Sequence, residues 1–227
     1  MGNKTSSAEK IREKKKLFLA REQRIIDASL ELFLDTGVDK VTVSGIASKA
    51  GIGKGTVYKH FLTKNEILAR IMLDYERSIT ASLAEGLVKV EKGDPYAAAR
   101  AYFTARLSRP ELDRLVQQLE VRLADSDEVR EQMEELHRIR RSNEQALEKL
   151  ITRQISRGVL EDVPPHFHYL SCWALAQGAV ELWFNKSWNY RTDTDQLIEF
   201  ITGIGVTMGN RGQYRALLSG ESKPSDE

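Results

Sequence analysis

The residues best suited to chemistry gather in one short run, residues 41–64, which reads VTVSGIASKAGIGKGTVYKHFLTK. Lysine and histidine side chains can meet phosphates, whereas serine, threonine and tyrosine hydroxyls can meet phosphates or base edges. These residue types indicate contacts with a nucleic acid. The candidates for such contacts are Lys54, Thr56, Tyr58, Lys59 and His60.

Two short helices joined by a tight turn are expected to hold these side chains. Thr42 or Ser44 can cap the first helix, because a hydroxyl there accepts a backbone N–H of the first turn. Gly51 ends that helix, since glycine takes the left-handed conformation at little cost. Val57 and Phe61 then give the second helix an inner face. The side chains expected to point outward are Lys54, Thr56, Lys59 and His60.

This arrangement predicts a helix-turn-helix, in which the second helix lies in the DNA major groove with its N-terminal residues at base edges. Lys54 is the foremost candidate for base readout, because lysine can donate to O6 and N7 of guanine. A plainer interpretation stays open. The same residues could form a solvated helical hairpin inside an all-α core.

Residues 24–68 resemble the DNA-binding domain of the tetracycline-repressor (TetR) family of bacterial transcriptional regulators. The matching pieces are IIDASLELFLDTGVDKVTVSGIASKAG, GKGTVYKHF and TKNEIL. The resemblance matches Thr42 and Thr56 to hydroxyls of the family's motif. It implies phosphate contacts from Tyr58, His60 and Lys64. It implies base readout from Ser44, Lys54, Gly55, Tyr58 and Lys59.

A phosphate-binding loop of nucleotide hydrolases is the rival interpretation of the glycines in residues 51–56. That loop needs glycine, lysine and serine or threonine in direct succession, preceded by a further glycine. Here Gly55 separates Lys54 from Thr56, and Ser48 stands where the earlier glycine would be. No apolar strand precedes the run, so nucleotide hydrolysis is not expected.

The net charge of +1 conceals two oppositely charged parts. Residues 1–70 carry 14 Lys or Arg and 8 Asp or Glu, whereas the remaining residues carry 20 and 25. The basic part contains the candidate helix-turn-helix, and positive charge supplies sequence-independent affinity for DNA by releasing counterions. The lysines at 14–16 favour either a solvated helix face or an arm that reaches the minor groove.

Motifs of catalysis, metal binding or cofactor binding are not recognisable in this sequence. His166 and His168 are two residues apart and so lie on different faces of a helix, whereas zinc on a helix needs histidines four apart. His137 and Cys172 have no partner at a ligand spacing. We therefore expect no enzyme, no metal site and no cofactor. A lone cysteine agrees with a cytoplasmic protein, and no run approaches the roughly 20 apolar residues of a membrane span.

Helical periodicity without strand-like alternation predicts an all-α fold of about nine helices. Residues 1–70 are expected to form the helix-turn-helix domain, with a basic extension at 1–20. Residues 71–218 are expected to form a helical ligand-binding and dimerisation domain, followed by a disordered tail at 219–227. A long helix from Lys64 to about Glu91 would join the two domains.

Two helices near the C-terminus, at about 166–188 and 192–208, are apolar over most of their circumference. One core face cannot absorb such a helix, so a further partner is expected. We interpret both helices as a two-fold dimer interface, with a purely internal position as the alternative. The interface candidates are Ala176, Ala179, Val180, Trp183, Phe200, Ile201, Ile204 and Gly205.

The helices from residue 64 to residue 188 would enclose a pocket if a small molecule controls the protein. Ligand sites are mostly apolar with a few placed polar groups, which favours an apolar or amphipathic effector. The apolar candidates are Tyr102, Phe103, Leu107, Leu119, Met133, Phe167, Leu170 and Trp173. The polar candidates are Gln118, Arg122, His137 and His168.

The function expected from these features is a homodimeric, ligand-responsive transcriptional regulator, most simply a repressor released from a pseudo-palindromic operator. Its partners would be double-stranded operator DNA, a second copy of the chain and a small-molecule effector, with no membrane. The alternative is a helical ligand-binding protein or enzyme in which the helix-turn-helix is only scaffold. Salt-dependent binding to DNA discriminates between the two.

Overall fold

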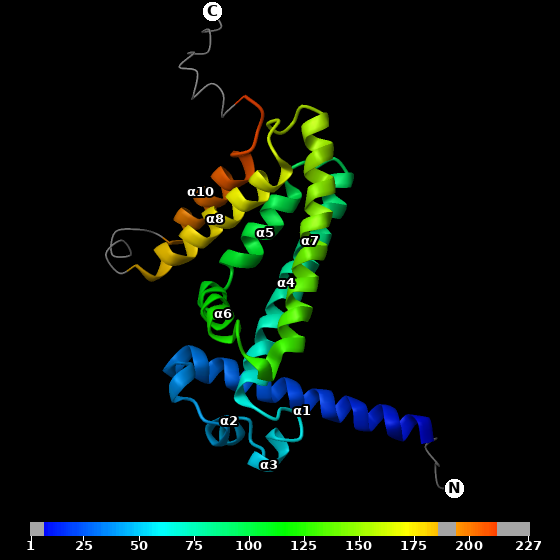
Figure 1. Cartoon of the computed structure of the whole chain (residues 1–227), viewed down its shortest axis with the longest axis vertical. Coiled ribbons are helices and arrows are strands. Elements are labelled where there is room, and N and C mark those ends of the chain that lie inside the picture. Colours follow the sequence, from blue (N-terminus) through cyan, green and yellow to red (C-terminus); the bar gives the residue numbers. More distant parts are fainter. Residues whose placement is uncertain (1–6, 186–193, 213–227) are drawn as a thin grey trace, which may run out of the picture. The chain divides into compact units, whose positions relative to one another are not determined.

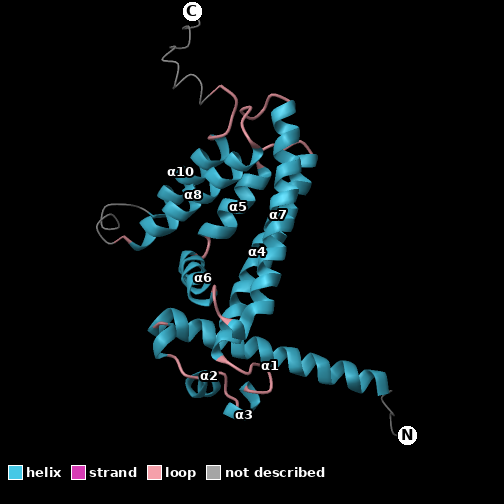
Figure 2. Cartoon of the chain, viewed as in Figure 1, coloured by secondary structure: helices cyan, strands magenta, loops and turns pink. Residues whose placement is uncertain are grey.

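The computed structural model describes residues 7–185 and 194–212. In these ranges the chain forms nine α-helices and two short 3₁₀ helices (Figure 1), and Figure 2 shows no strand among them. The prediction of an all-α fold is confirmed. The elements are α1 (Ser7–Thr36), η1 (Val38–Lys40), α2 (Val43–Lys49), α3 (Lys54–Val57), α4 (Lys64–Glu91), α5 (Ala97–Leu107), α6 (Pro110–Leu123), η2 (Asp127–Val129), α7 (Arg130–Ser156), α8 (Pro165–Phe184) and α10 (Thr194–Thr207).

Two compact units share these helices. The first contains Met1–Leu73 and Gln118–Met133, and the second contains Asp74–Gln117 and Glu134–Glu227. The boundaries fall inside α4, α6 and α7, so each of these helices contributes residues to both units. The expected domain boundary at residue 70 stays a prediction.

Helix α1 continues through the basic N-terminal segment, from Ser7 to Thr36. Lysine, arginine, glutamate and leucine, which have high helix propensity, dominate its first half. The second half contributes Ile25, Ile26 and Phe33 to the core of the first unit. The described part of the extension is therefore a helix and not an irregular arm.

One core cluster of the second unit lies where α5, α8 and α10 pack against one another (Figure 1). Gly205 of α10 permits this close approach, because a Cβ at this position would overlap the ring of Phe103. A larger residue at 205 would push α10 away from α5. The buried members of this core are Phe103, Leu107, Ala176, Ala179, Val180 and Ile201.

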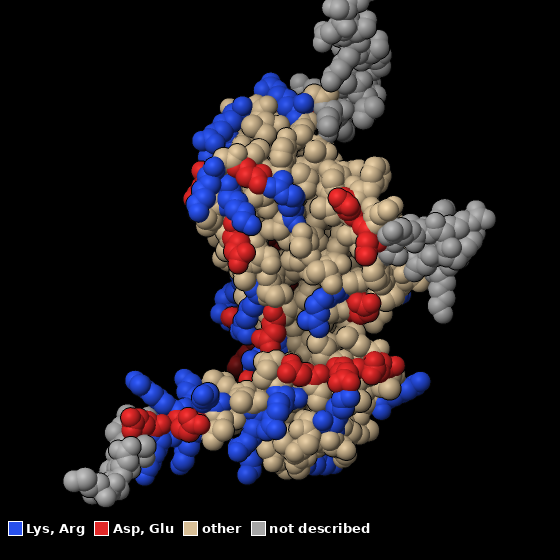
Figure 3. All heavy atoms as spheres, turned by 180° about the vertical axis from the view of Figure 1, so that it is seen from behind, with Lys and Arg blue, Asp and Glu red and all other residues tan. Residues whose placement is uncertain are grey.

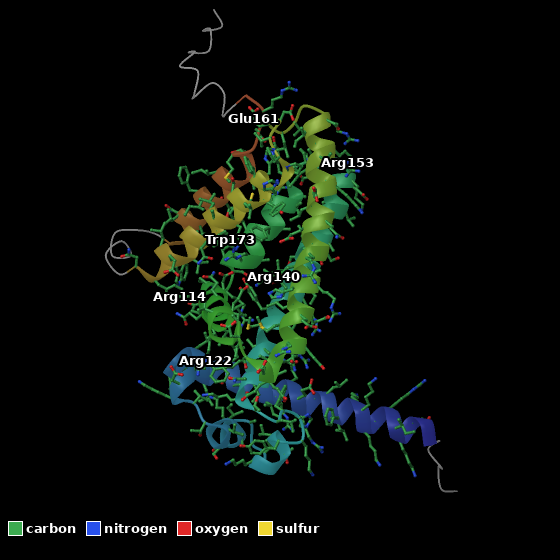
Figure 4. The ribbon with its side chains drawn as sticks, in the orientation of Figure 1. Arg114, Arg122, Arg140, Arg153, Glu161 and Trp173 are labelled. Carbon is green, nitrogen blue, oxygen red and sulfur yellow. The ribbon has the colours of Figure 1, made fainter. Side chains whose placement is uncertain are left out.

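Helices α4 and α7 are joined by polar contacts in the second unit. Arg140 Nε donates to Glu76 Oε2 at 2.9 Å, and Asn143 Nδ2 donates to Thr80 Oγ1 at 2.9 Å. Figure 4 labels Arg140 on α7, beside α4. The densely charged middle of α7 thus supplies contacts between helices as well as a solvent-exposed face.

A buried ion pair joins α5 to α6. Arg106 Nε donates to Asp113 Oδ2 at 2.6 Å, and its Nη2 donates to Oδ1 at 2.8 Å. Tyr75 of α4 and Gln117 of α6 also donate to this carboxylate, and Arg106 Nη1 donates to the Tyr102 hydroxyl at 2.9 Å. Burial and the charge of Asp113 raise the pKa of Tyr75, and burial raises the pKa of Tyr102. Both phenols therefore stay neutral.

The two apolar C-terminal helices are described over shorter ranges than expected. Helix α8 spans Pro165–Phe184 and α10 spans Thr194–Thr207. The expected residues 186–193 and the expected tail at 219–227 lie outside the described residues. Among the helices described, none is both long and apolar enough to cross a membrane.

Candidate nucleic-acid interface

The predicted turn between the two motif helices is present. Thr42 is the N-cap of α2, and its hydroxyl oxygen accepts the backbone N–H of Gly45 at 3.1 Å. The hydroxyl proton of Thr42 is still free to be donated to another acceptor. Gly51 has a φ of 66°, the left-handed conformation that ends α2. Ser44 is exposed on the first turn of α2.

The second motif helix, α3, is one turn long and is followed by a turn at 58–60. Val57 and Phe61 are buried, which confirms the predicted inner face. Thr56 is half-buried. The predicted contact residues that are exposed on this segment are Lys54, Gly55, Tyr58 and Lys59.

Lys54, the first residue of α3, and Tyr58, its C-cap, form an exposed pair. The Lys54 Nζ lies 5.8 Å from the centroid of the Tyr58 ring, within the range of a cation–π contact. A spacing of four residues puts both side chains on the same face of a helix. The pair therefore offers an ammonium group and a phenol to the same region of a partner.

The prediction that His60 points outward is wrong. Its side chain is only 2% exposed, and its ring centroid lies 4.0 Å from that of Phe18. Its Nδ1 lies 3.7 Å from Glu22 Oε2. Phe18 and Glu22 come from α1, so the residues that enclose this imidazole are distant in the sequence and invisible to local spacing.

Lys64 is only partly available to a partner. Its Nζ donates to the backbone oxygens of Val38 at 3.0 Å and Val41 at 3.2 Å. An ammonium group has three N–H donors, so one remains for a phosphate. Lys64 thus fixes the start of α4 to the segment that leads into α2.

Two ion pairs that the sequence did not single out fasten α1 to its neighbours. Arg70 Nη1 of α4 pairs with Glu22 Oε1, and Lys49 Nζ of α2 pairs with Glu31 Oε1. Glu22 also faces His60, so one carboxylate contacts both the end of the recognition segment and α4. These contacts hold the two motif helices in a fixed position on α1.

The apolar residues predicted to line a pocket do not converge. Phe103 and Leu107 belong to the core of the second unit, and Leu119 and Met133 are buried in the first unit. Tyr102 packs against the same core as Phe103, and its hydroxyl oxygen accepts a hydrogen bond from Arg106. The prediction is wrong for the residues that are exposed on α8, which are Phe167, Leu170 and Trp173.

The polar pocket candidates are also dispersed. Gln118 and His137 are exposed. Arg122 is exposed and pairs with Asp39 at 2.6 Å, which lowers the pKa of that carboxyl through a hydrogen bond and the guanidinium charge. His168 Nε2 lies 3.0 Å from the backbone oxygen of Glu161. Arg122 and His168 therefore each have a structural partner within the chain.

The predicted interface residues divide between two faces of α8 and α10. The prediction is wrong for the residues that are buried in the chain's own core, which are Ala176, Ala179, Val180, Ile201 and Gly205. Trp183 is half-buried. Phe200, at 66% exposure, and Ile204, at 42%, point outward. A helix that is apolar on both sides does not reveal from its sequence which side faces inward.

An exposed apolar face nevertheless covers the outer side of these two helices. Gly178 and Gly203 are exposed among its members, and a Cβ at either would meet no atom. Exposed apolar patches mark interaction sites in soluble proteins. We call this surface the α8/α10 apolar face, and its large members are Phe167, Leu170, Trp173, Leu182, Phe200 and Ile204.

Cys172 lies beneath that face. Burial raises the pKa of its thiol to about 11, and its Sγ contacts the backbone oxygen of Gly205 at 3.9 Å. The thiol is therefore a weak nucleophile at neutral pH. Over the described ranges, no cluster of three or more His, Cys, Asp or Glu is arranged to hold a metal ion.

The comparison with known sequences matches the N-terminal part of the chain. The profile of "Bacterial regulatory proteins, tetR family" matches residues 25–71. The transcriptional regulator SrpR of Pseudomonas putida is 50% identical over 50 residues, which are 22% of this chain and 24% of SrpR. The regulator BetI of Cronobacter sakazakii is 33% identical over 67 residues, which are 30% of this chain and 33% of BetI. The matches thus span a third or less of these relatives.

The fold is similar to solved structures over most of the chain. A tetR-family regulatory protein from Rhodococcus RHA1 has a TM-score of 0.66 and 18% identity, covering 85% of this chain and 98% of that one. NalD, the secondary repressor of the MexAB-OprM multidrug efflux pump in Pseudomonas aeruginosa, has a TM-score of 0.59 and 22% identity. That match covers 85% of this chain and 98% of NalD. The segment 25–71 therefore matches the DNA-binding domain of the tetR family, and the fold of the chain is similar to that of these solved structures.

Proposed function

We propose that the protein is a transcriptional regulator that reads double-stranded DNA through α3. The observation that carries this proposal is the exposed Lys54–Tyr58 pair on a helix whose inner side is fixed by Val57 and Phe61. Such a helix presents its N-terminal residues to base edges in the major groove. Base readout would come from Ser44, Lys54, Gly55, Tyr58 and Lys59.

Phosphate contacts would position α3 in the groove. Thr42, Thr56, Tyr58 and Lys64 keep a hydroxyl or ammonium donor that can reach a phosphate oxygen. His60 has a different role in this proposal. Because its ring is enclosed by α1, it positions the recognition segment and does not contact DNA itself.

We further propose that two copies associate through the α8/α10 apolar face. A two-fold dimer would bury the same face on both copies, and the exposed glycines would let the helices approach closely. Two copies would present two α3 helices. The operator would then be a pseudo-palindrome whose half-sites lie about one helical turn apart, or further if two dimers bind.

An apolar or amphipathic effector would control DNA binding, most simply by releasing a repressor. The cluster around Arg106 joins α4, α5, α6 and α8, through Tyr75, Tyr102, Asp113 and Gln177. A molecule that separated these helices would disturb this cluster and move α4. Because α4 begins at Lys64, which holds the segment before α2, its movement would reach the recognition helix. Effector and DNA would be coupled reciprocally, by about 1–3 kcal/mol.

Lys54→Ala is expected to weaken operator binding by about 1–3 kcal/mol and to relax base preference at one position in each half-site. Binding of a fluorescent duplex and its single-base variants measures both effects. Lys89→Ala removes the same charge from an exposed position of α4 in the second unit. It should leave the operator affinity and the base preference unchanged. An equal loss on operator and random DNA would instead make Lys54 a phosphate contact.

Salt dependence separates this function from the alternative in which the helix-turn-helix is only scaffold. Phosphate contacts make the logarithm of affinity fall linearly with the logarithm of salt concentration. A steep slope with sequence preference supports the regulator. Negligible binding to any duplex at low salt would favour a helical ligand-binding protein or enzyme.

A further inference from the structure

The first three turns of α1 carry cations that the recognition motif does not use. Residues 9–19 are all exposed, and Figure 1 shows this part of α1 running on past α2 and α3. Figure 3 shows blue Lys and Arg side chains clustered along it. In the part of the chain that the structure describes, none of these cations is found in an ion pair. They are Lys10, Arg12, Lys14, Lys15 and Lys16.

The contact between Phe18 and His60 fixes which side of α1 faces the recognition segment. An α-helix turns by about 100° per residue, so Lys14 and Lys15 lie within about 40° and 60° of the direction of Phe18. Glu9 and Glu13 lie about 140–180° away, on the opposite side. The helix thus presents Lys14 and Lys15 on the side that carries α3, whereas its carboxylates lie on the other side with Arg12 and Lys16.

We propose that Lys14 and Lys15 bind the phosphates of duplex DNA that flanks each half-site. The inference rests on the proposed function, because α3 must first place the first unit on DNA. From Phe18 to Ser7 the helix rises about 16 Å, which corresponds to about five base pairs beyond the last contact with the recognition segment. The operator is therefore longer than the segment whose bases α3 reads.

The shape of the extension decides how it meets DNA. An α-helix is about 10–12 Å across, whereas the minor groove is only about 6 Å wide. A helical extension therefore lies along the sugar–phosphate backbone and does not enter the minor groove. Its contacts are with phosphates, so they lengthen the site without adding base preference.

Charge complementarity favours DNA, and not a second copy of the helix, as the partner of the lysine-bearing side of α1. Lys10 and Lys14 are four residues apart, and like charges at this spacing destabilise a helix. Phosphates would relieve this repulsion, whereas a second basic helix would increase it. The apolar residues Ile11 and Phe18 on this side are seven apart and alone, too few for a continuous seam between two helices.

The test uses a duplex that the full-length wild-type protein selects from a random-sequence library. One version ends at the outer edge of the half-sites, and a second carries six more base pairs on each side. We compare Lys14→Gln/Lys15→Gln with Arg12→Gln/Lys16→Gln, which removes two charges from the same three turns but about 120–160° away from Phe18. Hydroxyl-radical footprinting and salt titrations report the contacts.

Wild-type protein and the Arg12/Lys16 variant are expected to bind the long duplex more tightly and to protect about five extra base pairs on each side. The Lys14/Lys15 variant should bind both duplexes alike, with a salt slope reduced by about 1.8 for each bound copy. Equal wild-type affinity for the two duplexes, or equal losses in both variants, would overturn the proposal while leaving readout by α3 intact. So would a change of oligomeric state in the Lys14/Lys15 variant, because the extension would then contact another copy. If no duplex is selected at all, the proposed function itself is wrong.

Discussion

Asp113→Ala is expected to destabilise the protein by about 3–5 kcal/mol, the cost of leaving a buried charge without its partner. Asp113 is 1% exposed, and its carboxylate accepts from Arg106, Tyr75 and Gln117. Removing it leaves the Arg106 guanidinium buried beside a cavity. Burial alone would lower the pKa of Arg106, but the hydrogen bond to Asp113 raises it overall, so the arginine stays charged. Urea denaturation followed by circular dichroism measures the loss.

Two further variants decide whether the unpaired charge is the cause. Glu111→Ala removes an exposed carboxylate from the same helix and should change stability by less than about 1 kcal/mol. Arg106→Met/Asp113→Leu removes both charges and should recover part of the loss, because no buried charge is left unpaired, although Tyr75 and Gln117 lose their acceptor. A loss below about 1 kcal/mol for Asp113→Ala would show that the ion pair is solvated in solution.

Phe200→Glu is expected to weaken dimerisation by about 2–4 kcal/mol, or about 30- to 1000-fold in dissociation constant. Phe200 is the most exposed large apolar residue of the α8/α10 apolar face. In a dimer its ring would be buried against the partner, and a carboxylate there would be desolvated without a counter-charge. Sedimentation velocity over a range of concentrations measures the change. The affinity for an operator with two half-sites should fall together with the strength of dimerisation.

Val121→Glu is the matched control for this change. Val121 is 83% exposed on α6 and lies outside the α8/α10 apolar face, so the same type of substitution should leave the sedimentation unchanged. Neither position contributes to a core, so both variants are expected to fold. Circular dichroism checks this. A Phe200→Glu protein that remains dimeric would move the interface to another surface.

The fold was largely predictable from local sequence signals. Thr42 as a cap, Gly51 as a helix end and the helical periodicity from Lys64 to about Glu91 are local signals, and the structure agrees with them. The all-α class followed from periodicity for the same reason. Val57 and Phe61 were also placed correctly, because a short helix with two apolar residues has only one side that it can bury.

The contact sites were less predictable, because they depend on partners distant in the sequence. The orientation of His60 is set by Phe18 and Glu22, and nothing in the local motif indicates this. On α8 both sides are apolar, so the sequence could not show that Ala176 faces inward while Trp173 faces outward. The ion pair between Arg106 and Asp113 was also missed, because each residue alone resembles a surface charge.

Selection of binding sites from a random duplex library tests the central claim most directly, since it needs no knowledge of the operator. If α3 reads bases and the chain acts as a two-fold dimer, wild-type protein will enrich one motif of two inverted half-sites about one helical turn apart. Lys54→Ala protein should lose preference at one symmetric pair of positions. Failure to enrich any motif over random DNA would contradict the account. So would enrichment of a motif without internal symmetry.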